Sequence, residues 1–282
     1  MKTIAELFGH MKANGSPDNY GIECELENIR NLPDNVPSWR AEEDGSLRFF
    51  GKEFVTRMPV PFDDVRKVLD ELRAGFEAGG IKPLASNLCS SHIHVDVRDL
   101  TVRQLLDFVA LLMVFEVDIA KNSGVDRFNN YFALGSCEAD ATQRKLIGIR
   151  TERDFVRFVQ MYQRGDLRYS GINFDSIGKY GSLELRFLGG QADPREIFPW
   201  IVFYNNLKDL AREGVDFQDV FAGVSEERFQ DFLNQVQVPF EPHFDNLIAG
   251  VRNAQDFVFG IHNKRLGAPE NGNGLKAYYD KL

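Results

Sequence analysis

Short segments in which polar and apolar residues alternate recur through the first two thirds of the chain. In YGIECELEN, from Tyr20 to Asn28, glutamates occupy the odd positions and apolar residues the even ones. Side chains alternate between the two faces of a strand, so this segment predicts a strand with one buried face and one acidic face. The same alternation appears in KEFVTRMP (52–59), CSSHIHVDV (89–97) and GSLELRFL (181–188). We therefore expect several amphipathic strands.

Longer segments with apolar residues at helical spacing lie between these strands. The segment from Pro61 to Gly80 begins with a proline and acidic residues and ends in glycines, as a helix should. A longer and mostly buried helix is expected from Thr101 to Lys121. Further helices are expected over 140–147, 152–164, 194–212, 225–236 and 251–263, with a short amphipathic helix near the N-terminus.

Composition and charge narrow the class of protein. The chain has 282 residues, of which 43% are hydrophobic and 12% aromatic, which is typical of a globular protein with one large domain. Its 33 basic and 42 acidic residues leave a net charge of −9, which argues against nucleic acid or a membrane surface as the main partner. The three cysteines show no C-x-x-C spacing, and no segment resembles a secretory signal or a membrane span. We expect a cytoplasmic protein.

The polar faces of the predicted strands hold an unusual set of side chains. They are mainly glutamate and histidine, with one arginine: Glu23, Glu25, Glu27, Glu53, His92, His94, Asp96, Glu184 and Arg186. Each strand taken alone is compatible with a polar face in water, but such faces usually also contain lysine, threonine, serine and glutamine. Carboxylates that share a face repel one another unless a positive charge lies between them. If the strands are neighbours, their polar faces form a surface suited to Mg²⁺ or Mn²⁺, since Zn²⁺ would prefer more histidines.

Five of these segments together resemble the amidoligases of the glutamine synthetase and glutamate–cysteine ligase superfamily. They follow the family's order along the chain: YGIECELE, EEDGSLRFFGKEFVTRMP, CSSHIHVDVRD, RYSGIN and SLELRFLGG. The resemblance implies an α+β fold, with a curved, mostly antiparallel sheet and helices on its convex face. We expect residues 1–212 to form the catalytic domain and residues 213–282 to form a C-terminal helical extension packed on it.

The resemblance also implies an ATP-dependent carboxylate–amine ligase. A carboxylate is a poor electrophile, so ATP must convert it to an acyl phosphate before an amine can form the amide bond. Catalysis of that transfer is largely positioning and neutralisation of charge by Mg²⁺ and cationic side chains. The expected partners are small-molecule or peptide carboxylates and amines, without nucleic acid or membrane, and the expected state is a monomer or small homo-oligomer.

The same resemblance implies a role for each motif residue. The expected metal ligands are Glu23, Glu25, Glu53, His92 and Glu184. The expected contacts to the nucleotide are His94, Arg168 and Asn173, with Tyr169 as an alternative to Asn173 and the two histidines interchangeable. Arg186 is expected to stabilise charge on the transferring phosphoryl group. Asp44 is expected to receive a proton from the incoming amine or to orient it.

Other interpretations stay open at this point. One is a zinc-dependent hydrolase built on His92, His94 and a carboxylate, although no third histidine lies in a ligand motif. Another is an inactive scaffold of the same fold, which would have no use for a repulsive cluster of acids. Glu27 is expected at the surface, and Asp96 is expected to pair with a nearby arginine such as Arg98. The sequence departs from the family pattern at Arg57, a candidate for selecting an acidic substrate.

Overall fold

The strands of the protein form one open sheet in which every paired strand is antiparallel to its neighbour. The computed structural model describes residues 1–9, 18–33, 35–123, 145–162, 170–215 and 226–265. The strands are β1 (Asn19–Leu26), β2 (Trp39–Glu43), β3 (Lys52–Thr56), β4 (Val60–Pro61), β5 (Ser90–Asp96), β6 (Ile172–Asn173) and β7 (Ser182–Gly189). Their order is β2-β3-β1-β5-β7-β6, and β4 pairs with β1. The predicted α+β fold with an antiparallel sheet is confirmed.

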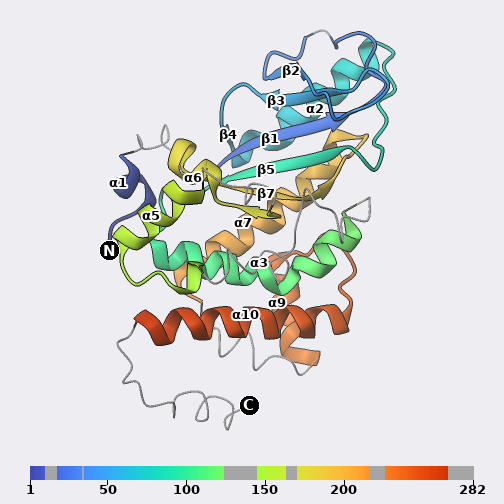
Figure 1. Cartoon of the computed structure of the whole chain (residues 1–282). Coiled ribbons are helices and arrows are strands. Elements are labelled where there is room, and N and C mark those ends of the chain that lie inside the picture. Colours follow the sequence, from blue (N-terminus) through green and yellow to red (C-terminus); the bar gives the residue numbers. More distant parts are fainter. Residues whose placement is uncertain (10–17, 34, 124–144, 163–169, 216–225, 266–282) are drawn as a thin grey trace.

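Helices cover one face of this sheet. Those described are α1 (Ile4–Phe8), α2 (Phe62–Ala78), α3 (Val102–Asn122), α5 (Glu152–Tyr162), α6 (Asp175–Tyr180), the 3₁₀ helix η3 (Pro194–Ile197), α7 (Phe198–Glu213), α9 (Glu226–Val236) and α10 (Phe244–Arg265). Helices α2, α3 and α7 contact the sheet, and α10 packs on α3 (Figure 1). No described helix combines the length and the hydropathy that a membrane span requires.

The alternation in the sequence decides which face of the sheet the helices cover. Ile22, Cys24 and Leu26 of β1 are at most 1% exposed, and Ile93 and Val95 of β5 are fully buried. Because Ile22 pairs with Ile93, these side chains share one face and form the core with the helices. The glutamates and histidines are thereby left on the opposite face, which these helices do not cover.

A bulge interrupts the pairing of β5 with β7. Ile93 pairs with Leu185, whereas Ser91 pairs with Leu188, so β7 has one more residue than β5 between these two pairs. The strict alternation predicted for this strand therefore ends at the bulge, and Leu188 joins Leu185 on the buried face. At this register shift, Arg186 and Phe187 of β7 lie opposite the single residue His92 of β5.

The last helix begins earlier than its apolar pattern predicts. Helix α10 starts at Phe244 rather than at position 251. The carboxylate of Asp118, near the C-terminal end of α3, accepts a hydrogen bond of 3.0 Å from the His243 backbone N–H and another from the Asn246 side chain. A carboxylate from a different helix thus binds the N-terminal end of α10 through one backbone N–H and one side-chain amide.

Other sequence expectations have mixed outcomes. The helix predicted over 140–147 lies mostly outside the described residues. The segment 194–212 is helical but begins as η3 before continuing as α7. The expected domain boundary after residue 212 falls at the end of α7, and it stays a prediction.

Candidate active site

Polar side chains form three rows across the face of the sheet opposite the helices. Directly paired residues on antiparallel strands point to the same face. The rows consist of Glu42, Glu53 and Glu25; of Glu23 and His92; and of His94, Glu184 and Asn173. Strand pairing thus brings residues from distant parts of the sequence to one surface.

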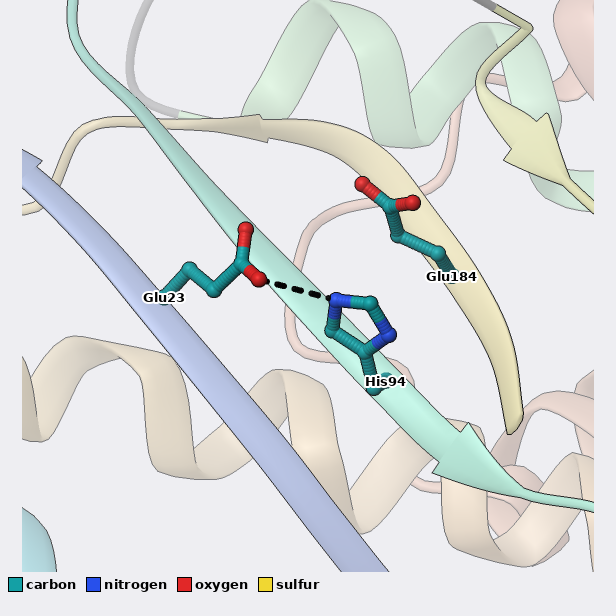
Figure 2. Close-up of side chains that lie close together, drawn as sticks. All are labelled: Glu23, His94 and Glu184. Atoms are coloured by element: carbon teal, nitrogen blue, oxygen red, sulfur yellow. Dashed lines mark hydrogen bonds and ion pairs between the residues drawn. The ribbon is translucent and has the colours of Figure 1, made fainter. Parts of the chain in front are cut away.

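Glu23 lies at the centre of this surface and contacts both histidines. Its Oε2 lies 3.0 Å from Nδ1 of His92, and its Oε1 lies 3.1 Å from Nε2 of His94. Figure 2 shows Glu23, His94 and Glu184 directed toward one another from three neighbouring strands. Nδ1 of His92 lies 3.7 Å from Oε1 of Glu184. Glu23 therefore joins the two imidazoles of β5, and His92 lies between Glu23 of β1 and Glu184 of β7.

The electrostatics of this cluster favour a positive charge between the carboxylates. Burial raises the pKa of Glu23, but hydrogen bonds to His92 and His94 and the charges of these imidazoles outweigh it and hold the pKa well below its usual range. Burial lowers the pKa of His94, but the hydrogen bond to Glu23 and the charges of Glu23 and Glu184 outweigh it and raise the pKa. Glu23 is therefore ionised, and cations are attracted to its surroundings.

Two sets of side chains on this surface have the geometry of a metal site. One set is Glu23, His94 and Glu184, and the other is Glu23, Glu53 and His92. In each set, one ligand atom per residue lies within 4.8 Å of the others. Two carboxylates and one imidazole are donors that fit Mg²⁺ or Mn²⁺, and water or phosphate oxygens can complete their octahedral shell. Because both sets include Glu23, two ions bound here would share its carboxylate.

Glu53 lies among several other carboxylates. It pairs directly with Glu25 on one side and with Glu42 on the other. Burial and the charges of Glu23, Glu25, Asp44 and Glu42 raise the pKa of Glu53 to about 7. A bound divalent cation would offset this repulsion.

Ser90 connects Glu25 to the histidine strand. Its backbone N–H and its hydroxyl donate to Oε2 of Glu25 at 2.8 and 2.5 Å, and the hydroxyl also lies 2.9 Å from Nε2 of His92. Sequence reasoning assigned no role to Ser90. The only available signal was its place two residues before His92.

Two neighbours hold Glu184 in place. The side-chain amide of Asn173 donates to its Oε2 at 2.6 Å, and Arg186 forms an ion pair with its Oε1. The side-chain oxygen Oδ1 of Asn173 in turn accepts a hydrogen bond of 3.0 Å from the backbone N–H of Asp175. In this arrangement Asn173 and Arg186 orient the carboxylate, while their expected roles toward nucleotide and phosphate stay predictions.

The remaining sequence candidates lie at the margins of the cluster or outside the described residues. Asp44 accepts a hydrogen bond of 2.7 Å from the backbone N–H of Ser46 in the turn after β2. Asp96 pairs with Arg98 through both of its oxygens, as predicted. Arg168 and Tyr169 lie outside the described residues.

The prediction that Glu27 lies at the surface is wrong. Only 2% of Glu27 is exposed, and its Oε1 accepts a hydrogen bond of 2.9 Å from the backbone N–H of Arg48. The loop between β2 and β3 folds back over the end of β1, because the backbone N–H groups of Asn28 and Ile29 donate to the carbonyls of Phe49 and Phe50. A position near the end of a strand is therefore buried.

A cavity opens beside the cluster on the same face. Its volume is about 290 Å³, and its lining includes Gly21, Glu23, Arg40, Arg57, His94 and Tyr180. Gly21 pairs with His94, and a Cβ atom at position 21 would lie only 3.1 Å from the Cβ of His94. The absence of a side chain at Gly21 therefore leaves room both for the imidazole and for the cavity floor.

An open antiparallel sheet with helices on one face and a glutamate–histidine cluster on the other agrees with the fold that the sequence resemblance implies. The model of the family described as "Putative amidoligase enzyme" matches residues 18–208. Because this match covers more than half of the chain, the protein belongs to this amidoligase family, which supports a ligase. The matched range contains the whole cluster and ends before α9 and α10. A comparison with curated proteins finds no match.

Proposed function

We propose that the protein is an ATP- and Mg²⁺-dependent carboxylate–amine ligase that forms an amide bond through an acyl phosphate. The observation that carries this proposal is Glu23, whose two oxygens contact different histidines and whose carboxylate belongs to both candidate metal sets. Paired divalent cations are a common means of neutralising the phosphates of ATP. Family membership supplies the class of reaction, and the shared carboxylate is the feature that such a pair of ions would need.

The proposed reaction has two steps. In the first, an oxygen of the acid substrate attacks the γ-phosphorus of ATP, and ADP leaves. In the second, the amine nitrogen attacks the acyl carbon, phosphate leaves, and a nitrogen-bound proton passes to a base. Mg²⁺, when bound, would neutralise the phosphate oxygens.

The protein's own residues would position the reactants. We assign the metal ligands to Glu23, Glu25, Glu53, Glu184 and His92, with His94 able to serve as a ligand or as a contact to the nucleotide. Arg186, on the bulged strand beside Glu184, is the proposed contact to the transferring phosphoryl group. Asp44 is the proposed proton acceptor, and Arg168 and Asn173 are the proposed nucleotide contacts. Substrates would be small-molecule or peptide acids and amines, the compartment cytoplasmic, and the protein a monomer or small homo-oligomer.

Thermal melting tests the proposal without knowledge of the substrates. Mg²⁺ together with a non-hydrolysable ATP analogue should raise the melting temperature more than either alone, because ions and phosphates neutralise one another. Glu23→Gln should abolish this joint effect. Glu213→Gln, at the exposed end of α7, is the matched control and should retain it.

Three outcomes separate the candidate functions. Joint stabilisation by Mg²⁺ and nucleotide that is lost in Glu23→Gln supports the ligase. A response to Zn²⁺ without any response to nucleotide would instead favour the zinc hydrolase, and no response to either would favour an inactive scaffold. ADP release with pooled acids and amines then identifies the reactive pool.

A further inference from the structure

Three buried side chains, Glu25, Ser90 and His92, form a continuous chain of hydrogen bonds behind the candidate metal ligands. The Ser90 hydroxyl lies 2.5 Å from Oε2 of Glu25 and 2.9 Å from Nε2 of His92. The chain joins two paired strands, because Cys24 of β1 lies opposite Ser91 of β5. A carboxylate is thereby connected to an imidazole through one hydroxyl group.

The direction of each hydrogen bond in this chain follows from the protons that the groups have to donate. Oε2 of Glu25 accepts a hydrogen bond of 2.8 Å from the backbone N–H of Ser90 and a second one from the Ser90 hydroxyl. A separation of 2.5 Å is typical of a hydroxyl that donates to a carboxylate. The hydroxyl has only one proton, and that proton is directed to Glu25. Its oxygen can therefore only accept from His92, so Nε2 of His92 is the donor.

The other ring nitrogen of His92 faces the carboxylates of the cluster. Nδ1 lies 3.0 Å from Oε2 of Glu23 and 3.7 Å from Oε1 of Glu184. Glu23 belongs to both candidate metal sets, and His92 belongs to one of them. A histidine that binds a metal usually donates its second ring N–H to a nearby acceptor, which fixes both the orientation of the ring and the nitrogen that binds the ion. The Ser90 hydroxyl occupies the place of that acceptor.

We propose that Glu25 and Ser90 are positioning residues that make Nδ1 of His92 the nitrogen that binds the divalent cation. Glu25 orients the Ser90 hydroxyl, the hydroxyl oxygen accepts from Nε2, and Nδ1 keeps its lone pair for the ion. Without the hydroxyl, a proton on Nδ1 bonded to Glu23 would be favoured, and that form has no lone pair directed at the cluster. This role uses Oε2 of Glu25 and leaves Oε1 for the ligand role assigned above. The inference rests on the proposed function for the bound ion, but not for ATP or the substrates.

Nitrogen-15 NMR of the full chain labelled at histidine tests which nitrogen binds the ion. The nitrogen chemical shifts and the couplings to the ring protons show which nitrogen of each imidazole carries a proton, and His92→Gln assigns the His92 signals. In wild type saturated with Mg²⁺, Nε2 of His92 should carry a proton and Nδ1 should not. In Ser90→Ala under the same conditions, a proton should appear on Nδ1. A proton on Nδ1 of His92 in Mg²⁺-saturated wild type would overturn the proposal.

Binding of Mn²⁺ to variants, measured by titration calorimetry, tests whether Glu25 acts through Ser90. Ser90→Ala should weaken binding about tenfold or more, whereas Ser90→Thr keeps the hydroxyl and should retain most of the affinity. Ser91→Ala is the matched control, since the buried Ser91 hydroxyl has no hydrogen-bond partner among the described residues, and it should leave the affinity unchanged. Because the two positioning residues act in series, Ser90→Ala should weaken binding less in Glu25→Gln than in wild type. Equal affinities in Ser90→Ala and Ser91→Ala, or fully additive losses in the double variant, would reject the proposed role.

The same measurements separate this proposal from the function on which it rests. Joint stabilisation by Mg²⁺ and nucleotide, with a proton on Nδ1 of His92, would reject the positioning role and leave the ligase standing. Metal binding through Nδ1 that depends on Ser90, without any response to nucleotide, would retain the positioning role and reject the ATP-dependent ligase. Failure of the wild type to bind Mg²⁺ or Mn²⁺ would reject both.

Discussion

Glu25 and Glu53 lie directly opposite one another on β1 and β3, and both carboxylates point to the uncovered face of the sheet. Like charges in this position destabilise a sheet by up to about 1 kcal/mol. The row continues with Glu42 opposite Glu53, which adds to the repulsion. A cation bound between the carboxylates would offset this repulsion.

The first prediction concerns the stability of the metal-free protein. Glu53→Gln should increase the free energy of unfolding at pH 8 by about 1 kcal/mol, because it removes one charge from the row. The folded-state pKa of Glu53 is about 7, above the ordinary value of 4.5. The fold therefore favours the protonated form of Glu53. The stabilisation relative to the ionised form is complete below pH 4.5 and is lost as the pH rises through 7. The difference between variant and wild type should disappear near pH 4.5, as measured by urea unfolding.

Excess Mg²⁺ provides the control for this prediction. It should stabilise wild type more than Glu53→Gln, since the variant lacks one ligand. A variant less stable than wild type at pH 8 in the presence of a chelator would contradict the account of repulsion.

The second prediction compares the ligands of the two metal sets. Glu23→Gln should weaken binding of Mn²⁺ more than either Glu53→Gln or Glu184→Gln, because Glu23 belongs to both sets and each of the others to one. We expect a loss of at least about tenfold for Glu23→Gln. Titration calorimetry with Mn²⁺ measures the affinity and the number of sites. Equal losses in all three variants would mean that the carboxylate of Glu23 is not shared.

The third prediction concerns the hydroxyl of Ser90. Ser90→Ala removes the contacts of the hydroxyl with Glu25 and His92, while the hydrogen bond of the Ser90 backbone N–H remains. The free energy of unfolding should therefore fall by about 1–2 kcal/mol. Ser91→Ala is the matched control, since the Ser91 hydroxyl is buried without a hydrogen-bond partner among the described residues. Its removal should be close to neutral. Chemical denaturation of both variants in the presence of a chelator measures these changes. Equal losses of stability in the two variants would exclude a specific role for the Ser90 hydroxyl.

The fourth prediction concerns the attachment of α7 to the sheet. Lys208 is fully buried, and its Nζ lies 3.0 Å from Asp18 and 3.1 Å from Asp99. Lys208→Met should lower the free energy of unfolding by about 2 kcal/mol or more, because it removes the positive charge that lies between the two carboxylates. Lys67→Met, on the exposed side of α2, should be within about 0.5 kcal/mol of wild type in the same denaturation experiment. A neutral Lys208→Met would show that Arg212 alone compensates both aspartates, since it contacts them as well.

Several features of the site were predictable from short stretches of sequence. Alternation within β5 places His92 and His94 on one face, and the apolar residues between them decide that this is the uncovered face. The five motifs and their order indicated the amidoligase family, which the family match confirms. These inferences succeed because the period of a strand is a local property of the backbone and because burial follows hydrophobicity.

Other features depend on contacts between segments far apart in the sequence. The contacts that Glu23 makes with both histidines follow from the register of β1 against β5, and the change of face at Leu188 follows from a bulge. Register and bulges are selected by the packing of whole strands and helices, which no single segment encodes. The burial of Glu27 has the same origin, because it depends on the loop between β2 and β3. Short segments of sequence therefore suffice to identify the residues of the polar face and the family of the chain. The contacts among those residues follow from the three-dimensional fold, because they depend on pairing between distant strands.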